Sequence, residues 1–274
     1  MSRGDIVAFL DDDAVAESNW LDALAAEFDD PEVAAAVGRC LPLKVETEAE
    51  HLWVRHHGPN WGSETRVVVS RSAPGWFTTA IFGDLGFGAN MAFRRAAFEV
   101  WPGFDERLGR GMPLEGNEEN YAFFSLVRLG YKLVSAPHAI VQHPHPPTME
   151  ALRSSRIRHS DSLAGFLCLL LVEEKGHRLE TLRFIFGKLR GRAARKTEKK
   201  SAAALVSPMR LLLAQLRGPW LYVLSTWKFH KSRKSSRAFV PFLARALSEP
   251  QIVRNPTVPR LPQPASAPPQ LRQA

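Results

Sequence analysis

The sequence predicts an α/β domain in its N-terminal half, followed by a basic helical region and a tail. Short apolar runs of strand length alternate with amphipathic segments over residues 1–150, the net charge changes sign near residue 150, and seven prolines fall within residues 250–274. We therefore expect a globular α/β portion over 1–150, basic amphipathic helices over 151–249, and a proline-rich disordered tail over 250–274.

Composition limits the class of protein. With 274 residues, of which 45% are hydrophobic, the chain can bury a sizeable core. The two cysteines, Cys40 and Cys168, lie far apart and belong to no CxxC or Cys/His pattern, which excludes a disulfide scaffold and indicates reduced cytosolic thiols. The longest apolar run without charge, residues 162–172, is shorter than the roughly 20 residues of a spanning helix. A polytopic membrane protein is therefore excluded.

The first segments predict a strand, a helix and a strand in turn. Residues 5–10 form a short apolar run that stops at three aspartates. Residues 19–28 place apolar side chains at helical spacing, and residues 33–37, followed by Gly38, have the composition of a second strand. A buried strand would thus present three carboxylates at its end.

Later segments of this half are less regular. A helix is expected near residues 49–57, and the aromatic, glycine-rich stretch 61–87 is expected to be largely a loop that lines a cleft. An apolar segment at 88–93 leads to a short helix and then to a glycine-rich, mobile loop at 103–111. A helix over 118–129 ends at Gly130, and a strand follows over 131–135.

The two halves carry opposite charge. Residues 1–150 contain 12 Lys and Arg against 22 Asp and Glu, a net charge of −10, whereas residues 151–274 contain 24 against 6, a net charge of +18. Carboxylates in the first half can bind a metal ion or act as bases, and the second half can bind phosphate on nucleic acid or anionic lipid. Its helices are expected at 163–172, 179–189, 202–216 and 239–247.

Asp11, Asp12 and Asp13 form the first candidate site. Adjacent carboxylates repel one another, so a fold keeps them at low cost only where a cation neutralises them or water solvates them. Oxygen ligands suit Mg²⁺ or Mn²⁺, and such an ion often completes its coordination shell with substrate phosphates and water. From spacing alone, an acidic surface turn at the start of the next helix explains the triplet equally well.

Several short motifs follow one another along the first half of the chain. They are Phe9-Leu-Asp-Asp-Asp-Ala14, Trp20-Leu21, Gly88-Ala-Asn-Met-Ala-Phe-Arg-Arg95, Gly103-Phe-Asp-Glu106, Glu118-Glu119, Gly130-Tyr131 and Val141-Gln-His143. In content and order they resemble the family 2 glycosyltransferases. The resemblance covers about residues 5–145 and implies a GT-A fold, a Rossmann-like mixed sheet in which a nucleotide-diphosphate sugar is bound through a metal ion at a DxD motif.

This resemblance implies roles for the acidic triplet and for a histidine. Asp11 and Asp13 would bind Mn²⁺ or Mg²⁺, and Asp11 and Asp12 would contact the donor, with Asp12 facing the ribose or the sugar. His143 would complete the metal shell, as a neutral imidazole can. A histidine beside two prolines is more often a plain loop residue, and His145 is the weaker candidate.

The general base of the resembled family is the second carboxylate of a Glu-Asp pair at the start of a helix. Here the pair is Glu118-Glu119, so Glu119 is the expected base, with Glu118 beside it, and glutamate preserves the proton chemistry. The helix macrodipole alone also favours acids at this position. Asn90 and Trp76 would contact the donor; the alternatives are a turn asparagine and a core tryptophan.

The functional expectation is an inverting, metal-dependent glycosyltransferase that moves a sugar from a nucleotide-diphosphate sugar to a hydroxyl of a cell-envelope or lipid-linked glycan. Family members carry about half a domain before the DxD strand, so an N-terminally truncated domain is expected, with its nucleotide-binding half absent or supplied by another polypeptide.

The basic half would hold a cytoplasmic protein on the inner face of the cell membrane through peripheral contact with anionic lipid. The alternatives are an inactive truncated remnant and a protein that binds nucleic acid or another anionic surface through this half. No nucleic-acid motif is recognisable there, so nucleic acid is not an expected partner.

Overall fold

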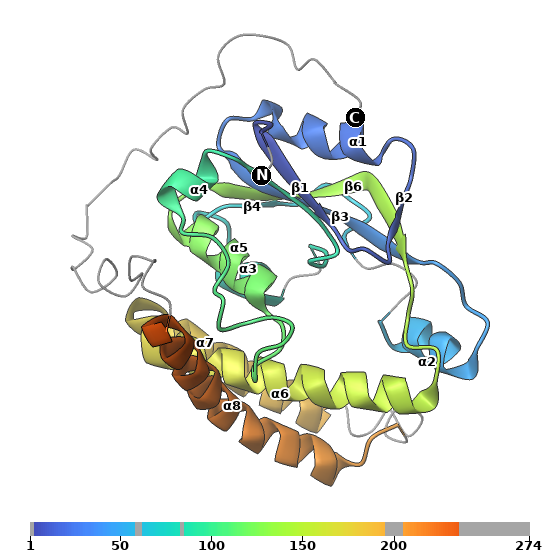
Figure 1. Cartoon of the computed structure of the whole chain (residues 1–274), viewed down its shortest axis with the longest axis vertical. Helices are drawn as coiled ribbons and strands as arrows, with labels where there is room; N and C mark the ends of the chain where they lie inside the picture. Colours follow the sequence, from blue (N-terminus) through green and yellow to red (C-terminus); the bar gives the residue numbers. More distant parts are fainter. Residues whose placement is uncertain (1–2, 58–61, 83–84, 195–204, 236–274) are drawn as a thin grey trace.

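The computed structural model describes residues 3–57, 62–82, 85–194 and 205–235, and it shows a mixed sheet above a layer of three long helices (Figure 1). The expected helix at 239–247 and the tail over 250–274 lie outside the described residues. No helix in the described part of the chain has both the length and the apolar character needed to cross a membrane.

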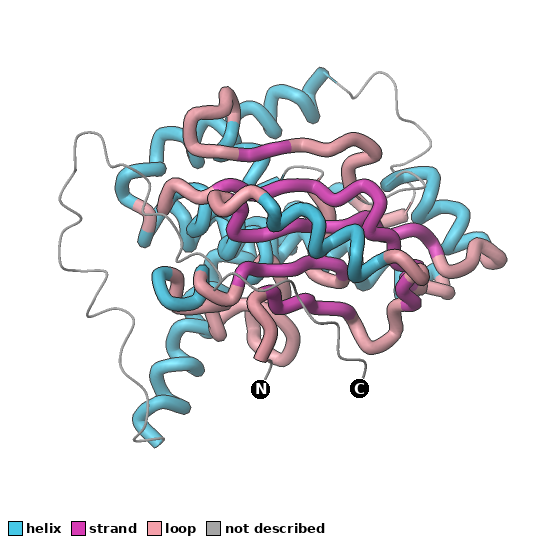
Figure 2. Tube along the Cα trace, turned by 90° about the horizontal axis from the view of Figure 1, so that it is seen from above, coloured by secondary structure: helices cyan, strands magenta, loops and turns pink. Residues whose placement is uncertain are grey.

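Six strands form the sheet, in the order β1-β5-β3-β6-β2, with β4 also paired to β6 (Figure 2). The pair β3–β6 is parallel, and the other described pairs are antiparallel, which confirms the mixed sheet expected for a GT-A-like fold. The strands are β1 (Ile6–Leu10), β2 (Val15–Ala16), β3 (Val33–Pro42), β4 (Val68–Val69), β5 (Asn90–Arg94) and β6 (Lys132–His143).

Alternate residues of each strand point to opposite sides of the sheet. Both sides are buried, because helices pack against each of them. On one side, Leu24 of α1 and Phe28 of the following 3₁₀ helix belong to a cluster with Ala36 and Val134. On the other side, side chains of α5 pack against Phe93 and neighbouring strand residues. The helices concerned are α1 (Trp20–Ala25), α3 (Trp76–Phe82), α4 (Ala97–Val100) and α5 (Glu118–Arg128), with the 3₁₀ helix at Ala26–Asp29.

Several elements differ in length from the sequence prediction. The strand expected at 131–135 continues to His143, and the stretch 61–87 contains α3 and β4 as well as loop. The expected helix at 163–172 starts earlier, at Met149, because Thr148 accepts a hydrogen bond from the Ala151 amide and so caps the helix. A further helix, α2 (Glu48–His57), lies where it was predicted.

The basic region forms α6 (Met149–Glu173), α7 (Arg178–Ala194) and α8 (Pro208–Ser235), with a 3₁₀ turn at Lys175–His177. Helix α6 shares a core with the sheet layer, since Phe166, Leu169 and Leu170 cluster with Phe124 of α5 and Tyr222 of α8. These helices therefore support the domain that precedes them.

A buried arginine fastens the glycine-rich loop to these helices. The Arg107 guanidinium, whose side chain is 8% exposed, donates to Asp105 Oδ2 at 2.6 Å and to Glu173 Oε1 of α6 at 2.5 Å. From α8, the Tyr222 hydroxyl donates to Glu173 Oε1 at 2.6 Å, and the Ser225 hydroxyl donates to the Arg107 carbonyl. The loop that was expected to be mobile is thus held by a charged network.

We expect Arg107→Met to lower the free energy of unfolding by about 2–4 kcal/mol, because it leaves two partly buried carboxylates without their cation. Chemical denaturation measures this loss. The neighbouring exposed Arg110→Met is the control and should change stability by no more than about 0.5 kcal/mol. Equal stability of the two variants would contradict the role assigned to Arg107.

Candidate active site

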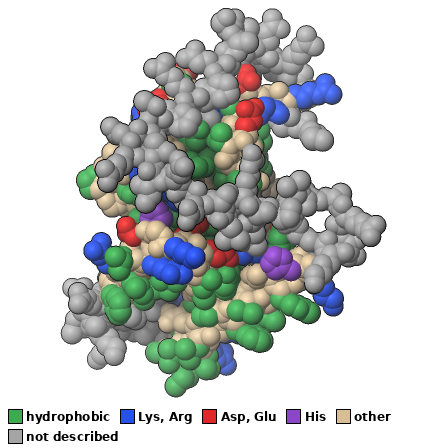
Figure 3. Space-filling model, turned by 90° about the vertical axis from the view of Figure 1, so that its left-hand side faces the viewer, with side chains coloured by type: hydrophobic (Ala, Val, Ile, Leu, Met, Phe, Trp, Pro, Cys, Tyr) green, Lys and Arg blue, Asp and Glu red, His purple; other side chains and the backbone are tan. Residues whose placement is uncertain are grey.

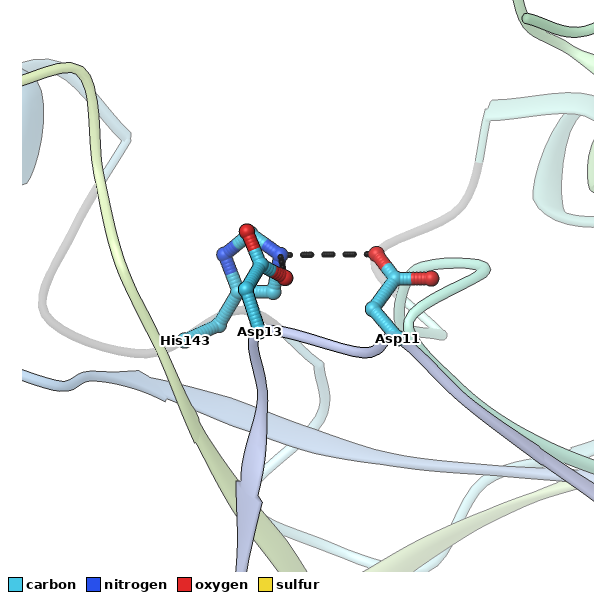
Figure 4. Close-up of side chains that lie close together, drawn as sticks. All are labelled: Asp11, Asp13 and His143. Carbon is cyan, nitrogen blue, oxygen red and sulfur yellow. Dashed lines mark ion pairs between the residues drawn. The ribbon is translucent and has the colours of Figure 1, made fainter.

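Two strand ends bring an acidic cluster together. Asp11 follows β1 directly, and Asp13 lies one residue before the Ala14 that leads into β2. Because β2 pairs with the end of β6, Val15 lies opposite Gln142, and this places Asp13 beside His143. Figure 4 shows the three side chains pointing toward one another. One ligand atom of each lies within 4.8 Å of the others, and we call them the Asp–His cluster.

The contacts of the His143 ring make the cluster suited to a cation. Its Nδ1 lies 2.7 Å from the Pro144 carbonyl oxygen, which can only accept, so Nδ1 carries a proton. Its Nε2 lies 3.4 Å from Asp11 Oδ2 and 3.3 Å from Asp13 Oδ1. A neutral ring would therefore turn a lone pair toward two carboxylate oxygens. A cation shared by the three groups relieves this repulsion.

The cluster is open on one side. The Asp11 and Asp13 side chains are 52% and 56% exposed, whereas His143 is 21% exposed. An ion bound there would keep coordination positions for ligands from solution, as Mg²⁺ and Mn²⁺ sites that bind phosphate do. Asp12 is exposed and does not belong to the cluster.

A second pair of carboxylates begins α5. Gly116 and Asn117 adopt left-handed backbone conformations, with φ of 94° and 70°, and α5 starts immediately after them. The Asn117 side chain is buried and donates to the Ser162 hydroxyl of α6 at 2.5 Å. Helix α6 therefore fixes the turn that presents Glu118 and Glu119.

The segment before β5 joins the two groups of carboxylates. A Cβ atom on Gly88 would lie 3.9 Å from side-chain atoms of Glu119, so this glycine borders the glutamate. The next residue, Ala89, accepts a hydrogen bond from the Asp11 amide at 3.4 Å. Residues 88–89 thus contact the Glu119 side chain and the Asp11 backbone, and the charge of Asp11 acts on Glu119, so the two groups lie near each other.

The pKa values of the glutamates reflect this proximity. Burial raises the pKa of Glu119 to about 7, with further contributions from the negative charges of Glu118 and Asp11. Burial also raises the pKa of Glu118, and Asp11 adds to this, while the positive charge of Arg110 opposes it. A carboxylate with a pKa near neutrality can accept a proton at physiological pH.

Glu118 is covered by the glycine-rich loop. At Gly109, where φ is +91°, a Cβ atom would lie 3.4 Å from Glu118 Cδ. Glu118 Oε2 is buried and has no hydrogen-bond partner among the described residues. Loop 103–111, which Arg107 fastens to α6 and α8, therefore covers Glu118.

Asn90, which was predicted to contact the donor, lies buried beneath the site. Its side chain is 0% exposed and accepts from Trp20 Nε1 at 2.8 Å, while its amide donates to the carbonyls of Arg39 at 2.9 Å and Ala139 at 2.8 Å. A Cβ on Gly38 would lie 2.3 Å from the Asn90 amide nitrogen. Asn90 instead joins the strands beneath the site.

The Trp76 ring packs against other aromatic side chains. Its ring stacks on Phe124 at 6.1 Å and meets His177 edge-on at 5.5 Å. It lines a groove between α3 and α7 together with Phe184, so the structure does not bring it to the Asp–His cluster. His145, the weaker metal candidate, is buried, with its ring 5.4 Å from that of Trp53.

Sequence reasoning did not identify Asn117, Arg107 or Arg110 as parts of this site. A usable signal existed for Asn117, since Gly-Asn directly before a predicted helix favours a left-handed turn. Arg107 pairs locally with Asp105, but its partner in α6, Glu173, lies 66 positions away and has no sequence signal.

Comparison with known proteins places this geometry in context. Residues 1–100 match the family described as Glycosyl transferase family 2. The chain is 30% identical over 144 residues to the O-antigen chain rhamnosyltransferase WbaN of Salmonella anatum, a match that covers 52% of this chain and 42% of the relative. It is 30% identical over 142 residues to RfbN of Salmonella typhimurium, also named an O-antigen chain rhamnosyltransferase, with 52% and 41% covered.

A third relative is more distant. The chain is 28% identical over 142 residues to the pre-mycofactocin glycosyltransferase of Mycobacterium tuberculosis, a match that covers 52% of this chain and 27% of the relative. The matched region spans less than half the length of each of these curated relatives.

Proposed function

Because the N-terminal part of this chain belongs to the family 2 glycosyltransferases, we propose that the protein transfers a sugar from a nucleotide-diphosphate sugar to an acceptor hydroxyl with inversion at the anomeric carbon. The observation that carries this proposal is the proximity of Asp11 and Glu119, which both contact residues 88–89 and whose charges interact. A donor diphosphate held at the Asp–His cluster would then have a general base nearby.

Asp11, Asp13 and His143 would hold Mn²⁺ or Mg²⁺. The donor set fits, since two carboxylate oxygens and one imidazole nitrogen converge within 4.8 Å and leave an open side. When bound, such an ion neutralises the charge that develops on the diphosphate leaving group. Asp12, which is exposed beside the cluster, would contact the ribose or the sugar of the donor.

Glu119 would act as the general base. Its carboxylate removes the proton of the acceptor hydroxyl as the acceptor oxygen forms a bond to the anomeric carbon. The bond between that carbon and the diphosphate oxygen breaks on the opposite side, and the electron pair leaves with the nucleoside diphosphate. Attack and departure on opposite faces give inversion. Glu118 acts through Glu119, because its negative charge keeps the pKa of Glu119 high.

The acceptor proposed here is a cell-envelope or lipid-linked glycan. Two of the relatives are named for the O-antigen chain, and residues 151–274 carry a net charge of +18, which suits contact with anionic lipid. We place the protein in the cytoplasm, peripherally bound to the inner face of the cell membrane.

The rate of transfer should depend on pH through Glu119. Only the ionised form of Glu119 accepts a proton, and burial raises its pKa to about 7, so kcat should fall as the pH drops below that value. A cation bound beside Asp11 would offset the negative charge of Asp11, which raises the pKa of Glu119, so the cation would lower that pKa. Measurement of kcat from pH 5 to 9 checks this, and a rate that rises toward acidic pH would contradict it.

Removal of divalent metal should abolish transfer. Release of nucleoside diphosphate from a panel of nucleotide-diphosphate sugars, measured with a glycan acceptor, is expected with Mn²⁺ or Mg²⁺ and should disappear when EDTA is added. Added Mn²⁺ should restore it. Turnover that persists in EDTA after the protein has been stripped of metal would show that the Asp–His cluster does not work through an ion.

A further inference from the structure

Helix α8 presents an apolar stripe to solvent. Seven large side chains, spaced three or four positions apart or adjacent, are each about half exposed or more. They are Met209 (63%), Leu212 (49%), Leu213 (57%), Leu216 (68%), Trp220 (61%), Val223 (50%) and Trp227 (60%). At 100° per residue they fall within one sector about 100° wide, and from Met209 to Trp227 they extend about 27 Å. We call this set the α8 stripe.

The opposite side of α8 is buried. Ala214, Gly218 and Tyr222 face α6, and a Cβ on Gly218 would lie 2.6 Å from the Ala164 side chain, so the two helices are in close contact. Helix α8 is thus apolar on two opposite sides. A helix of this kind is normally covered on both sides, but in this chain the described residues cover only one.

The positive charge of α8 indicates which kind of partner could cover the α8 stripe. Residues 208–235 contain six Lys and Arg and no Asp or Glu. Arg210, Lys228 and Lys231 are exposed, and Lys231 Nζ lies 5.1 Å from the centre of the Trp227 ring at the edge of the stripe. Figure 3 shows hydrophobic and basic side chains exposed together over the lower, helical part of the molecule.

From these observations we infer that the α8 stripe lies on the surface of an anionic lipid bilayer. Exposed tryptophans with flanking cations are the composition of helices that lie in the membrane interface, where the apolar side enters the acyl region and the cations meet lipid phosphates. A second copy of the chain fits less well, because two such helices would bring their cations together without an acid on either one.

The stripe is linked to the proposed active site. Lys228 donates to the Gly111 carbonyl at 2.9 Å, and Ser225 donates to the Arg107 carbonyl. The same loop covers Glu118 through Gly109. Bilayer binding would therefore hold the general-base side of the site close to the membrane. This consequence rests on the proposed catalytic role of Glu119, and the bilayer contact assigns the peripheral membrane binding of the proposed function to α8.

Vesicle flotation with the full chain tests the inference, in the absence of any sugar donor. The protein should float with vesicles that contain about one third phosphatidylglycerol in phosphatidylcholine, and several-fold less with phosphatidylcholine alone. The double variant Trp220→Ser and Trp227→Ser should lower partitioning into the anionic vesicles at least about ten-fold. Tryptophan emission of the wild type should shift to the blue on binding.

Matched controls separate the stripe from general effects. Leu21→Ser and Val15→Ser remove apolar side chains that are 46% and 52% exposed on the sheet domain, and they should leave flotation unchanged. Glu119→Gln should float like the wild type, so that a failure of catalysis is distinguishable from a failure of membrane binding.

Three results would overturn the inference. The first is no flotation of the wild type with anionic vesicles. The second is flotation that the tryptophan double variant retains in full, which would assign binding to other basic residues. The third is a dimer, seen by light scattering, that the double variant converts to a monomer while flotation is absent, which would make the stripe a contact between copies of the chain.

Discussion

Glu119→Gln is expected to lower kcat for sugar transfer by about 10²- to 10⁴-fold, the range that a general base contributes. Glutamine has the shape of glutamate but cannot accept the acceptor's proton. The donor site lies on other residues, so KM for the nucleotide sugar should change much less than kcat. Steady-state kinetics with varied donor measures both constants.

The same variant should be more stable than the wild type at alkaline pH. In the folded chain the pKa of Glu119 is raised to about 7 by burial and by neighbouring carboxylates, above its ordinary value of 4.5. Its ionisation therefore opposes folding, and the stability present at low pH is lost as the pH rises through about 7. The Tm of Glu119→Gln should exceed that of the wild type at pH 8, and the difference should shrink toward pH 4.5.

This pairing of lost activity with gained stability rules out misfolding as the cause of inactivity. A variant that lost both activity and Tm at pH 8 would indicate a structural role for Glu119. A variant that kept its activity would remove Glu119 from the mechanism.

Asp13→Asn is expected to lower kcat/KM on the order of 10²-fold or more, because it weakens the binding of the proposed ion, whose effect on the leaving group would be worth several kcal/mol. The side chain keeps its size, and Asp13 is 56% exposed, so stability should change little. Raising the Mn²⁺ concentration should recover part of the lost rate.

Asp12→Asn is the matched control for metal binding. It removes the same charge from the adjacent position, but Asp12 does not belong to the Asp–His cluster. Its affinity for Mn²⁺ should therefore stay close to that of the wild type, while its KM for the donor increases. Equal losses of Mn²⁺ affinity in both variants would mean that the triplet attracts cations only through its total charge.

Sequence patterns predicted the sheet domain well where the signals were local. The apolar run that forms β1, the amphipathic segment that forms α1 and the helix stop at Gly130 each depend on a few neighbouring residues. The helices of the basic region that the structure describes, α6, α7 and α8, were predicted too short. Helix α8 carries apolar residues on two sides and continues through Pro219, so its pattern lacks the single stripe on which helix prediction relies.

The sequence predicted which residue types form the site, but it did not predict which residues contact one another there. The meeting of Asp13 with His143 depends on the pairing of β2 with β6, two strands more than a hundred residues apart. For Asn90 the motif predicted a donor contact, but the close approach of Gly38 and the Trp20 hydrogen bond place its side chain in the core. Such contacts arise only after the sheet has formed, and no local pattern encodes them.

The central claim is that Asp11, Asp13 and His143 hold the ion that binds the donor diphosphate. The most direct test is the position of Mn²⁺ in a crystal of the full chain grown with Mn²⁺ and a nucleoside diphosphate. Anomalous scattering should place the ion between Asp11, Asp13 and His143, about 2.0–2.3 Å from their ligand atoms, with diphosphate oxygens in the remaining positions. An anomalous peak elsewhere, or a diphosphate bound away from these three residues, would contradict it.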